Sequence, residues 1–191
     1  RCEIIFMRIT GGQARGIPLK VPTKGAVRPA TDYIREAVFN SLASWIPGAT
    51  VLDLFTGTGA YALEALSRGA KQATSIDLKT SAELTANAQA VAKSMAVEHL
   101  PFKIITGDAL RPDLVAEKFH LVFADPPWEL WETHAEVLVA TAVSYAASDD
   151  AIVALEAPGG FTVPIPAGWK LRKVIGKGKG QPAASLLVRD V

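Results

Sequence analysis

Short apolar segments alternate with helical segments through most of the chain, and this alternation limits the fold more than any other feature. The apolar segments with the length and residue types of buried strands are residues 51–55, 73–77, 102–106, 119–124 and 151–156. The helical segments between them are residues 59–68, 81–95, 110–117 and 130–147. Such alternation predicts an α/β, Rossmann-like fold: a mostly parallel sheet with helices on both faces and right-handed crossovers.

The two ends of the chain predict smaller additions to this sheet. Residues 8–12 and 19–22, separated by glycine and proline, predict an N-terminal hairpin or arm. A helix follows from Thr31 or Asp32 to about residue 45. At the other end, residues 169–175 and 184–189 predict a closing antiparallel strand pair. We expect residues 1–48 to be an arm and helix that cover the site, and residues 49–191 to be one compact domain.

A glycine-rich turn follows the first predicted strand, in the sequence DLFTGTG at residues 53–59. Parallel sheets bind ligands at the carboxyl ends of their strands, and glycines there let the backbone approach the ligand closely. The helix that begins after the turn offers unpaired N–H groups. The third glycine of a dinucleotide fingerprint is replaced by Ala62. A tight strand–helix turn without a ligand is the alternative interpretation.

Acidic residues stand at the ends of the next two predicted strands. Asp77 can accept hydrogen bonds from both hydroxyls of a ribose. Asp108, in the sequence Gly107-Asp108-Ala109, can accept one from the amino group of an adenine. Either residue can instead cap the helix that follows it. Together with the glycine turn, the two carboxylates predict one site of nucleoside shape.

The sequence Asp125-Pro126-Pro127-Trp128 follows the fourth predicted strand and is the most specific motif in the chain. The two prolines remove backbone donors and stiffen the chain, so the Asp125 carboxylate and nearby carbonyls remain as acceptors. An exocyclic amine is a weak nucleophile because its lone pair is delocalised into the ring, and acceptors for its hydrogens steer that lone pair. Trp128 offers a flat face for a base. A proline-rich turn with a packing tryptophan is the alternative.

These motifs resemble a known family. Residues 53–59 resemble the first motif of class I methyltransferases, and residues 125–128 resemble the [DN]-P-P-[FYW] motif of those that methylate amines. The segments RITGGQARG, RPATD, REAVFN and LEALSRGA resemble the RsmD family, at residues 8–16, 28–32, 35–40 and 63–70. The family usually carries Phe or Tyr where Trp128 stands. The resemblance runs from about residue 8 to residue 188.

The resemblance implies an S-adenosylmethionine-dependent enzyme that methylates N2 of a guanine, at position 966 of 16S ribosomal RNA. It implies that Asp125, Pro126, Pro127 and Trp128 act on the target base. The residues that it implies around the cofactor are Arg28, Thr31, Arg35, Asp53, Phe55, Thr56, Gly57, Gly59, Asp77, Leu78, Asp108, Ala109 and Asp125. No metal is expected, because no His, Cys and Asp residues cluster with the spacing of metal ligands.

Composition restricts the partners. The net charge is only +1, so contacts to nucleic acid must come from local basic groups. Such groups lie near the N-terminus (Arg8, Arg15, Lys20, Lys24 and Arg28) and near the C-terminus (Lys170, Arg172, Lys173, Lys177 and Lys179).

The single cysteine fits a reducing cytoplasm, and no apolar run is long enough to span a membrane. We expect a monomeric enzyme whose substrate is a partly assembled small ribosomal subunit. Residues 1–6 precede Met7, a candidate for the native start.

Other functions compete with this hypothesis. The same turn serves enzymes that methylate adenine N6 in DNA or a protein glutamine, since each acceptor is a planar amine. A nucleotide-binding assembly protein without catalysis would bind the cofactor without turnover. A nicotinamide-dependent oxidoreductase is disfavoured, because no group for hydride transfer accompanies the glycine turn.

Overall fold

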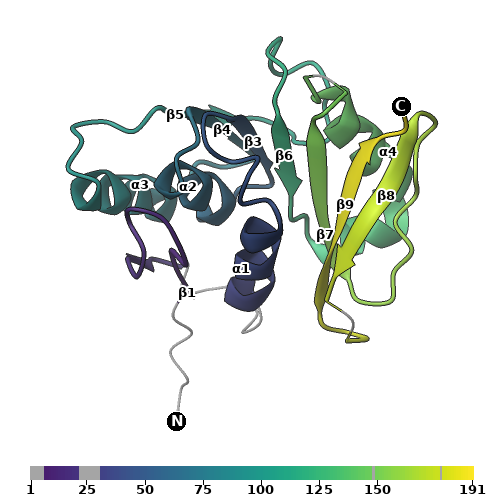
Figure 1. Ribbon diagram of the computed structural model, residues 1–191, viewed down its shortest axis with the longest axis horizontal. Helices are drawn as coiled ribbons and strands as arrows, with labels where there is room; N and C mark the ends of the chain where they lie inside the picture. The colour runs from purple at the N-terminus through teal and green to yellow at the C-terminus, as the bar shows by residue number, and fades with distance from the viewer. Residues whose placement is uncertain (1–6, 22–30, 148, 177) are drawn as a thin grey trace.

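The computed structural model describes residues 7–21, 31–147, 149–176 and 178–191. In these residues a seven-stranded sheet has the order β5-β4-β3-β6-β7-β9-β8 (Figure 1). Its strands are β3 (Thr50–Leu54), β4 (Gln72–Asp77), β5 (Phe102–Thr106), β6 (Leu121–Ala124), β7 (Ile152–Pro158), β8 (Trp169–Ile175) and β9 (Pro182–Arg189). The strands β5, β4, β3, β6 and β7 pair in parallel, and β9 runs antiparallel to both β7 and β8. The predicted parallel sheet and its closing antiparallel pair are confirmed.

Helices cover both faces of the sheet. They are α1 (Thr31–Ser41), α2 (Ala60–Ser67), α3 (Ala82–Ser94) and α4 (Trp128–Ser144). The first three lie on one face and α4 on the other (Figure 1). Successive residues of β3 point to opposite faces of the sheet. Val51 belongs to the hydrophobic cluster of α1 and α2, and Leu52 belongs to that of α4. Burial on both faces explains why β6, with the sequence LVFA, is apolar throughout.

The N-terminal arm forms the predicted hairpin with shorter strands. β1 (Met7–Arg8) pairs antiparallel with β2 (Pro18–Leu19). Its Ile9 is fully buried in a cluster with Leu63 of α2 and Val91 of α3. The arm is therefore packed against the helices of the sheet.

The helix α1 packs into the main core as well. Its Val38 and Phe39 share a hydrophobic cluster with β3 and β6. It ends at Ser41, earlier than the predicted residue 45. The packing of α1 is continuous with that of the sheet. The division of the chain at residue 48 into an arm with its helix and a compact domain remains a prediction.

The predicted helix over residues 110–117 is wrong. Pro112 cannot continue a helical hydrogen-bond ladder. The bond that a helix would form between residues 110 and 114 is replaced at both ends: the Leu110 carbonyl accepts from Thr141 Oγ1 at 3.0 Å, and Leu114 N donates to the Tyr145 hydroxyl at 3.3 Å. Side chains of α4 and of its C-terminal end thus hold this segment as a series of turns.

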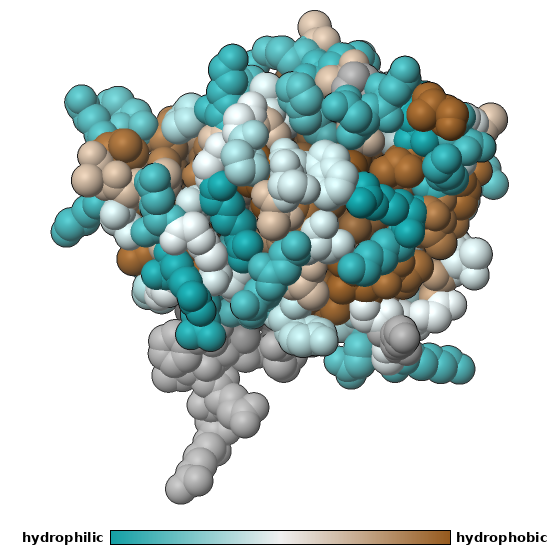
Figure 2. Space-filling view, viewed as in Figure 1, coloured by the Kyte–Doolittle hydropathy of each residue, from teal (hydrophilic) through white to brown (hydrophobic). Residues whose placement is uncertain are grey.

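No helix in the described residues is long and apolar enough to cross a membrane. On the face of the molecule seen in Figure 2, hydrophobic residues gather over the end of the sheet formed by β7, β9 and β8, and mainly hydrophilic residues lie over α2 and α3.

Candidate active site

A cavity of about 590 Å³ opens at the carboxyl ends of β3, β4, β6 and β7. This edge includes the point between β3 and β6 where the strand order reverses, which is the usual place for a ligand in such sheets. The predicted site residues that line the cavity are Arg35, Asp53, Phe55, Thr56, Gly57, Asp77, Leu78, Asp108, Ala109, Asp125, Pro126 and Pro127. The structure therefore brings the separate sequence motifs together. Arg28 and the side chain of Thr31 lie outside the described residues.

The glycine turn after β3 is held in an unusual backbone conformation. Phe55 has a φ of 60° and Gly57 a φ of 52°, so both lie in the left-handed region. A Cβ atom on Gly57 would meet nothing closer than 4.0 Å, which leaves the backbone open to a ligand. A Cβ atom on Gly59 would lie 2.5 Å from Leu84 Cδ1. Gly59 is thus buried beneath the turn and does not line the cavity, so its small size serves packing against α3.

The buried carboxylate of Asp53 holds the glycine turn by hydrogen bonds. It is 1% exposed, and its Oδ2 accepts hydrogen bonds from Thr56 Oγ1 at 2.7 Å and from Ala62 N at 3.1 Å. Because Thr56 donates to Asp53, its hydroxyl accepts from Ser75 Oγ at 2.8 Å. Burial raises the pKa of Asp53 to about 7, against the lowering effect of the two hydrogen bonds. A hydrogen-bond network that joins β3, the glycine turn, β4 and α2 thus shapes the floor of the cavity.

Asp77 links the glycine turn to the end of β4. Its Oδ2 accepts from Gly57 N at 2.9 Å, and its Oδ1 from Lys79 N at 3.3 Å. Ser81 caps α3 by accepting from Leu84 N, so Asp77 is not the cap of that helix. Its carboxylate stays partly exposed at the cavity.

Asp108 turns the chain after β5. It is exposed, and its Oδ1 accepts from Leu110 N at 3.0 Å. The alternative that it caps a helix at residue 110 is wrong, because no helix forms there. Leu78 lines the same cavity and is 68% exposed, so a large apolar side chain projects beside the two carboxylates.

Sequence reasoning missed two buried residues of the cavity that carry titratable side chains. Tyr61 of α2 and Glu156 of β7 both line it, and the Tyr61 hydroxyl donates to Glu156 Oε2 at 2.8 Å. Burial raises the pKa of Tyr61 well above its usual value, with the nearby carboxylates of Glu156 and Asp125 adding to the effect. Glu156 ends a predicted strand, so the same rule that selected Asp77 would have selected it.

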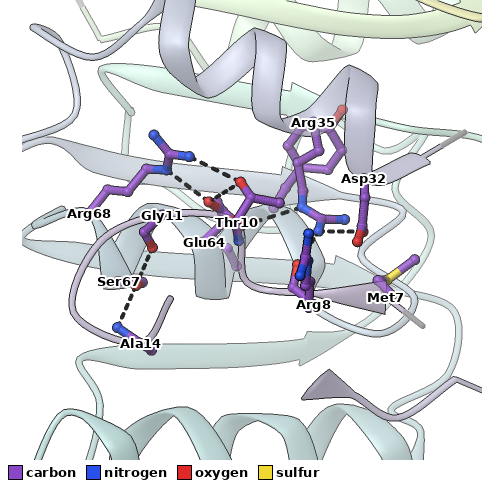
Figure 3. Close-up of polar contacts among 12 residues, drawn as sticks. Met7, Arg8, Thr10, Gly11, Ala14, Asp32, Arg35, Glu64, Ser67 and Arg68 are labelled. Carbon is purple, nitrogen blue, oxygen red and sulfur yellow. Dashed lines mark hydrogen bonds and ion pairs between the residues drawn. The ribbon is translucent and has the colours of Figure 1, made fainter. Parts of the chain in front are cut away.

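Arg35 joins the cavity to the arm (Figure 3). The residue is 1% exposed and donates to the Arg8 carbonyl and, at 2.7 Å, to Asp32 Oδ1. Its Nε lies 3.5 Å from Glu64 Oε2 in an ion pair. Arg35 lines the cavity, and its contact with the cofactor remains a prediction.

Known proteins are similar to this chain over nearly its whole length. Ribosomal RNA small subunit methyltransferase D of Escherichia coli K12 is 34% identical over 189 residues, which cover 96% of this chain and 90% of that protein. A family model described as conserved hypothetical protein 95 matches residues 7–184. The chain belongs to the RsmD family.

Solved structures agree with membership of the RsmD family. The Escherichia coli protein yhhF has a TM-score of 0.74 and 32% identity, with 97% of this chain and 99% of that chain covered. SMU.776, solved in complex with SAH, has a TM-score of 0.70 at 14% identity, with 91% and 54% covered. The second likeness shows the methyltransferase fold alone.

Trp128 takes a different place from its neighbours in this RsmD-family site. It is the first residue of α4, partly buried, and packs against the hydrophobic cluster on that side of the sheet. It is not among the cavity-lining residues, whereas Asp125, Pro126 and Pro127 are. Stacking of a base on Trp128 therefore remains a prediction.

The basic clusters expected on this RsmD-family chain are partly engaged with other side chains. Arg172 lies 4.3 Å from the centroid of the Trp45 ring, and Lys170 Nζ lies 3.0 Å from Asp190 Oδ1. Lys24, Arg28 and Lys177 lie outside the described residues. Among the residues that are described, no three His, Cys, Asp or Glu side chains are grouped to hold a metal ion.

Proposed function

We propose that this chain transfers a methyl group from S-adenosylmethionine to the N2 amine of a guanine in the 16S ribosomal RNA of the small subunit. One observation carries the proposal: the glycine turn with Asp77 and the Asp125-Pro126-Pro127 turn line a single cavity. The first would hold the methyl donor and the second the acceptor amine. A relative 34% identical over nearly the whole chain is named ribosomal RNA small subunit methyltransferase D.

The cavity residues fit S-adenosylmethionine. The open space over Gly57 admits a ligand against the backbone, which a Cβ atom would obstruct. The carboxylates of Asp77 and Asp108 suit the ribose hydroxyls and the adenine amine, and Leu78 offers an apolar contact to a ring. When bound, this cofactor supplies a methyl group made electrophilic by its sulfonium sulfur.

The chain's own residues would prepare the acceptor. Asp125 follows β6 directly, and its carboxylate would accept a hydrogen bond from the target amine, which would direct the nitrogen lone pair into the cavity. Pro126 is buried and Pro127 exposed, and the pair hold the turn rigid. Most of the rate enhancement would come from holding donor and acceptor in line. The base must leave its stack to reach this cavity.

We further propose that the substrate is a partly assembled small ribosomal subunit and that the enzyme acts as a cytoplasmic monomer. A nearly neutral chain gains little affinity from phosphate contacts alone, so the shape of an assembled particle would supply specificity. Equal rates on naked 16S RNA and on particles would contradict this idea.

The test in cells compares ribosomal RNA from a strain that lacks the gene with RNA from complemented strains. We expect the strain without the gene to lose one N2-methylguanosine from 16S RNA. The wild-type gene should restore it, and a gene for Asp125→Ala should not. An unchanged content of N2-methylguanosine in the strain without the gene would contradict the proposed function.

A further inference from the structure

Glu156 lies beside Asp125 at the edge of the sheet. The strands β6 and β7 pair in parallel with Ala124 opposite Leu155, so Asp125 and Glu156 occupy the next position on each strand. Both side chains line the cavity. Two carboxylates from adjacent strands therefore face the place where the acceptor base would enter.

The position of Glu156 is fixed by its neighbours. The residue is 2% exposed, and its Oε2 accepts the Tyr61 hydroxyl at 2.8 Å. Its backbone carbonyl accepts from Trp131 Nε1 at 2.9 Å. Tyr61 is itself held by stacking on Phe123, with the ring centroids 5.0 Å apart. One hydrogen bond thus holds the Glu156 carboxylate and another holds the backbone of the same residue, and a side chain fixed in this way is preorganised to select a ligand by hydrogen bonding.

The chemistry of guanine gives such a carboxylate a partner. The Watson–Crick edge of guanine presents two neighbouring donors, the N1–H and the N2 amine. If Asp125 accepts from the amine, a second acceptor is required for N1–H. Adenine and 2-aminopurine have a lone pair at N1, which a carboxylate would repel. A fixed acid beside Asp125 thus distinguishes guanine from bases that lack the N1 proton.

We propose that Glu156 is a specificity-determining residue that accepts the N1–H of the target guanine, while Tyr61 positions its carboxylate. The inference rests on the proposed function, because it assumes that guanine is the acceptor. It goes further by assigning base selection to a residue outside the Asp125–Trp128 motif.

The experiment uses small subunits reconstituted with ribosomal RNA that carries either guanosine or 2-aminopurine riboside at the methylated position. Both bases keep the 2-amine, and only guanine has a proton at N1. Tritiated S-adenosylmethionine measures kcat/KM on each particle. Glu156→Gln retains an oxygen for the Tyr61 hydroxyl and gains an amide N–H that can donate to N1 of 2-aminopurine.

We expect wild type to prefer guanine by about a hundredfold or more, as sites built around a polar contact do. Glu156→Gln should lower that preference at least tenfold, mainly through a faster reaction with 2-aminopurine. Tyr61→Phe removes the hydroxyl that positions the Glu156 carboxylate. It should therefore slow the reaction with guanine more than that with 2-aminopurine, and so lower the preference, but by less than Glu156→Gln does.

Two outcomes would overturn the inference at different levels. If Glu156→Gln slows both reactions equally and keeps the wild-type preference, Glu156 has only a structural role and the inference is wrong. If wild-type enzyme labels neither particle, the proposed function fails, and the assignment of Glu156 fails with it.

Discussion

The carboxylate of Glu64 holds Thr10 twice: Oε2 accepts from the Thr10 backbone nitrogen at 2.8 Å and Oε1 from its hydroxyl at 2.7 Å (Figure 3). Glu64 is fully buried in α2, and Arg68 Nε lies 2.8 Å from its Oε1. Arg35 of α1 approaches the other oxygen. One carboxylate thus joins the arm, α1 and α2 next to the cavity.

Replacement of Glu64 by Gln should destabilise the protein. The change leaves the guanidinium groups of Arg35 and Arg68 without their buried counter-charge, and breaking a buried ion pair costs about 3–5 kcal/mol. Urea denaturation should show a lower free energy of unfolding, and amide hydrogen exchange should be faster in residues 7–21. The matched control is Asp113→Asn, which removes an exposed ion pair with Arg111 and should change neither measurement. Equal stability of the two variants would contradict the structural role of Glu64.

Gly57 and Gly48 offer a matched pair for testing the cofactor site. Both have positive φ values, 52° and 77°, and a Cβ atom at either position meets no close neighbour. Alanine at either site should therefore cost about 1–2 kcal/mol of stability through backbone strain. Only Gly57 lines the cavity. Isothermal titration with S-adenosylmethionine should show affinity at least about tenfold weaker for Gly57→Ala and unchanged for Gly48→Ala.

Asp53 should make stability depend on pH in a defined window. Its pKa is about 7 in the folded protein and 3.8 ordinarily, so folding takes up a proton between these values. The stability that the neutral form of Asp53 provides is complete below about pH 4 and is lost as the pH rises toward about 7. Asp53→Asn imitates the neutral form and keeps an oxygen for Thr56 and Ala62. Thermal melts should show the Tm of this variant rising relative to wild type from about pH 4 to pH 7. A constant difference across the window would show that the carboxyl ionises normally.

Asp125 should affect turnover far more than cofactor binding. Asp125→Ala removes the acceptor for the target amine, and we expect kcat to fall by about 10²–10⁴-fold. The thermal stabilisation by S-adenosylmethionine should remain close to that of wild type. A variant that loses cofactor binding and turnover together would assign Asp125 to the cofactor instead.

The strand ends were predictable, and the residues around them only in part. The residue types and length of the apolar segment predict β5 with the bounds that the structure has. Asp77 and Asp125 line one cavity because a parallel sheet brings the carboxyl ends of its strands to one edge, and their roles remain predictions. The helix at residues 110–117 was wrong because contacts from Thr141 and Tyr145, about thirty residues away, outweigh local propensity.

The sequence does not predict which buried side chains contact one another. The sequence does not predict that a Cβ atom on Gly59 would lie 2.5 Å from Leu84 Cδ1 of α3, and contact of Gly59 with the cofactor remains a prediction. Tyr61 was not selected, because helical periodicity predicts only that it is buried. Its bond to Glu156 spans 95 residues and depends on how α2 crosses the sheet.

The most direct test of the central claim is a methyl-transfer assay with tritiated S-adenosylmethionine and small ribosomal subunits from cells that lack this protein, followed by separation of the nucleosides. We expect label in N2-methylguanosine with wild-type enzyme and a severe loss of label with Asp125→Ala. Label in a different nucleoside would keep the enzyme and change its acceptor. Absence of label despite tight cofactor binding would contradict the catalytic role assigned to the cavity.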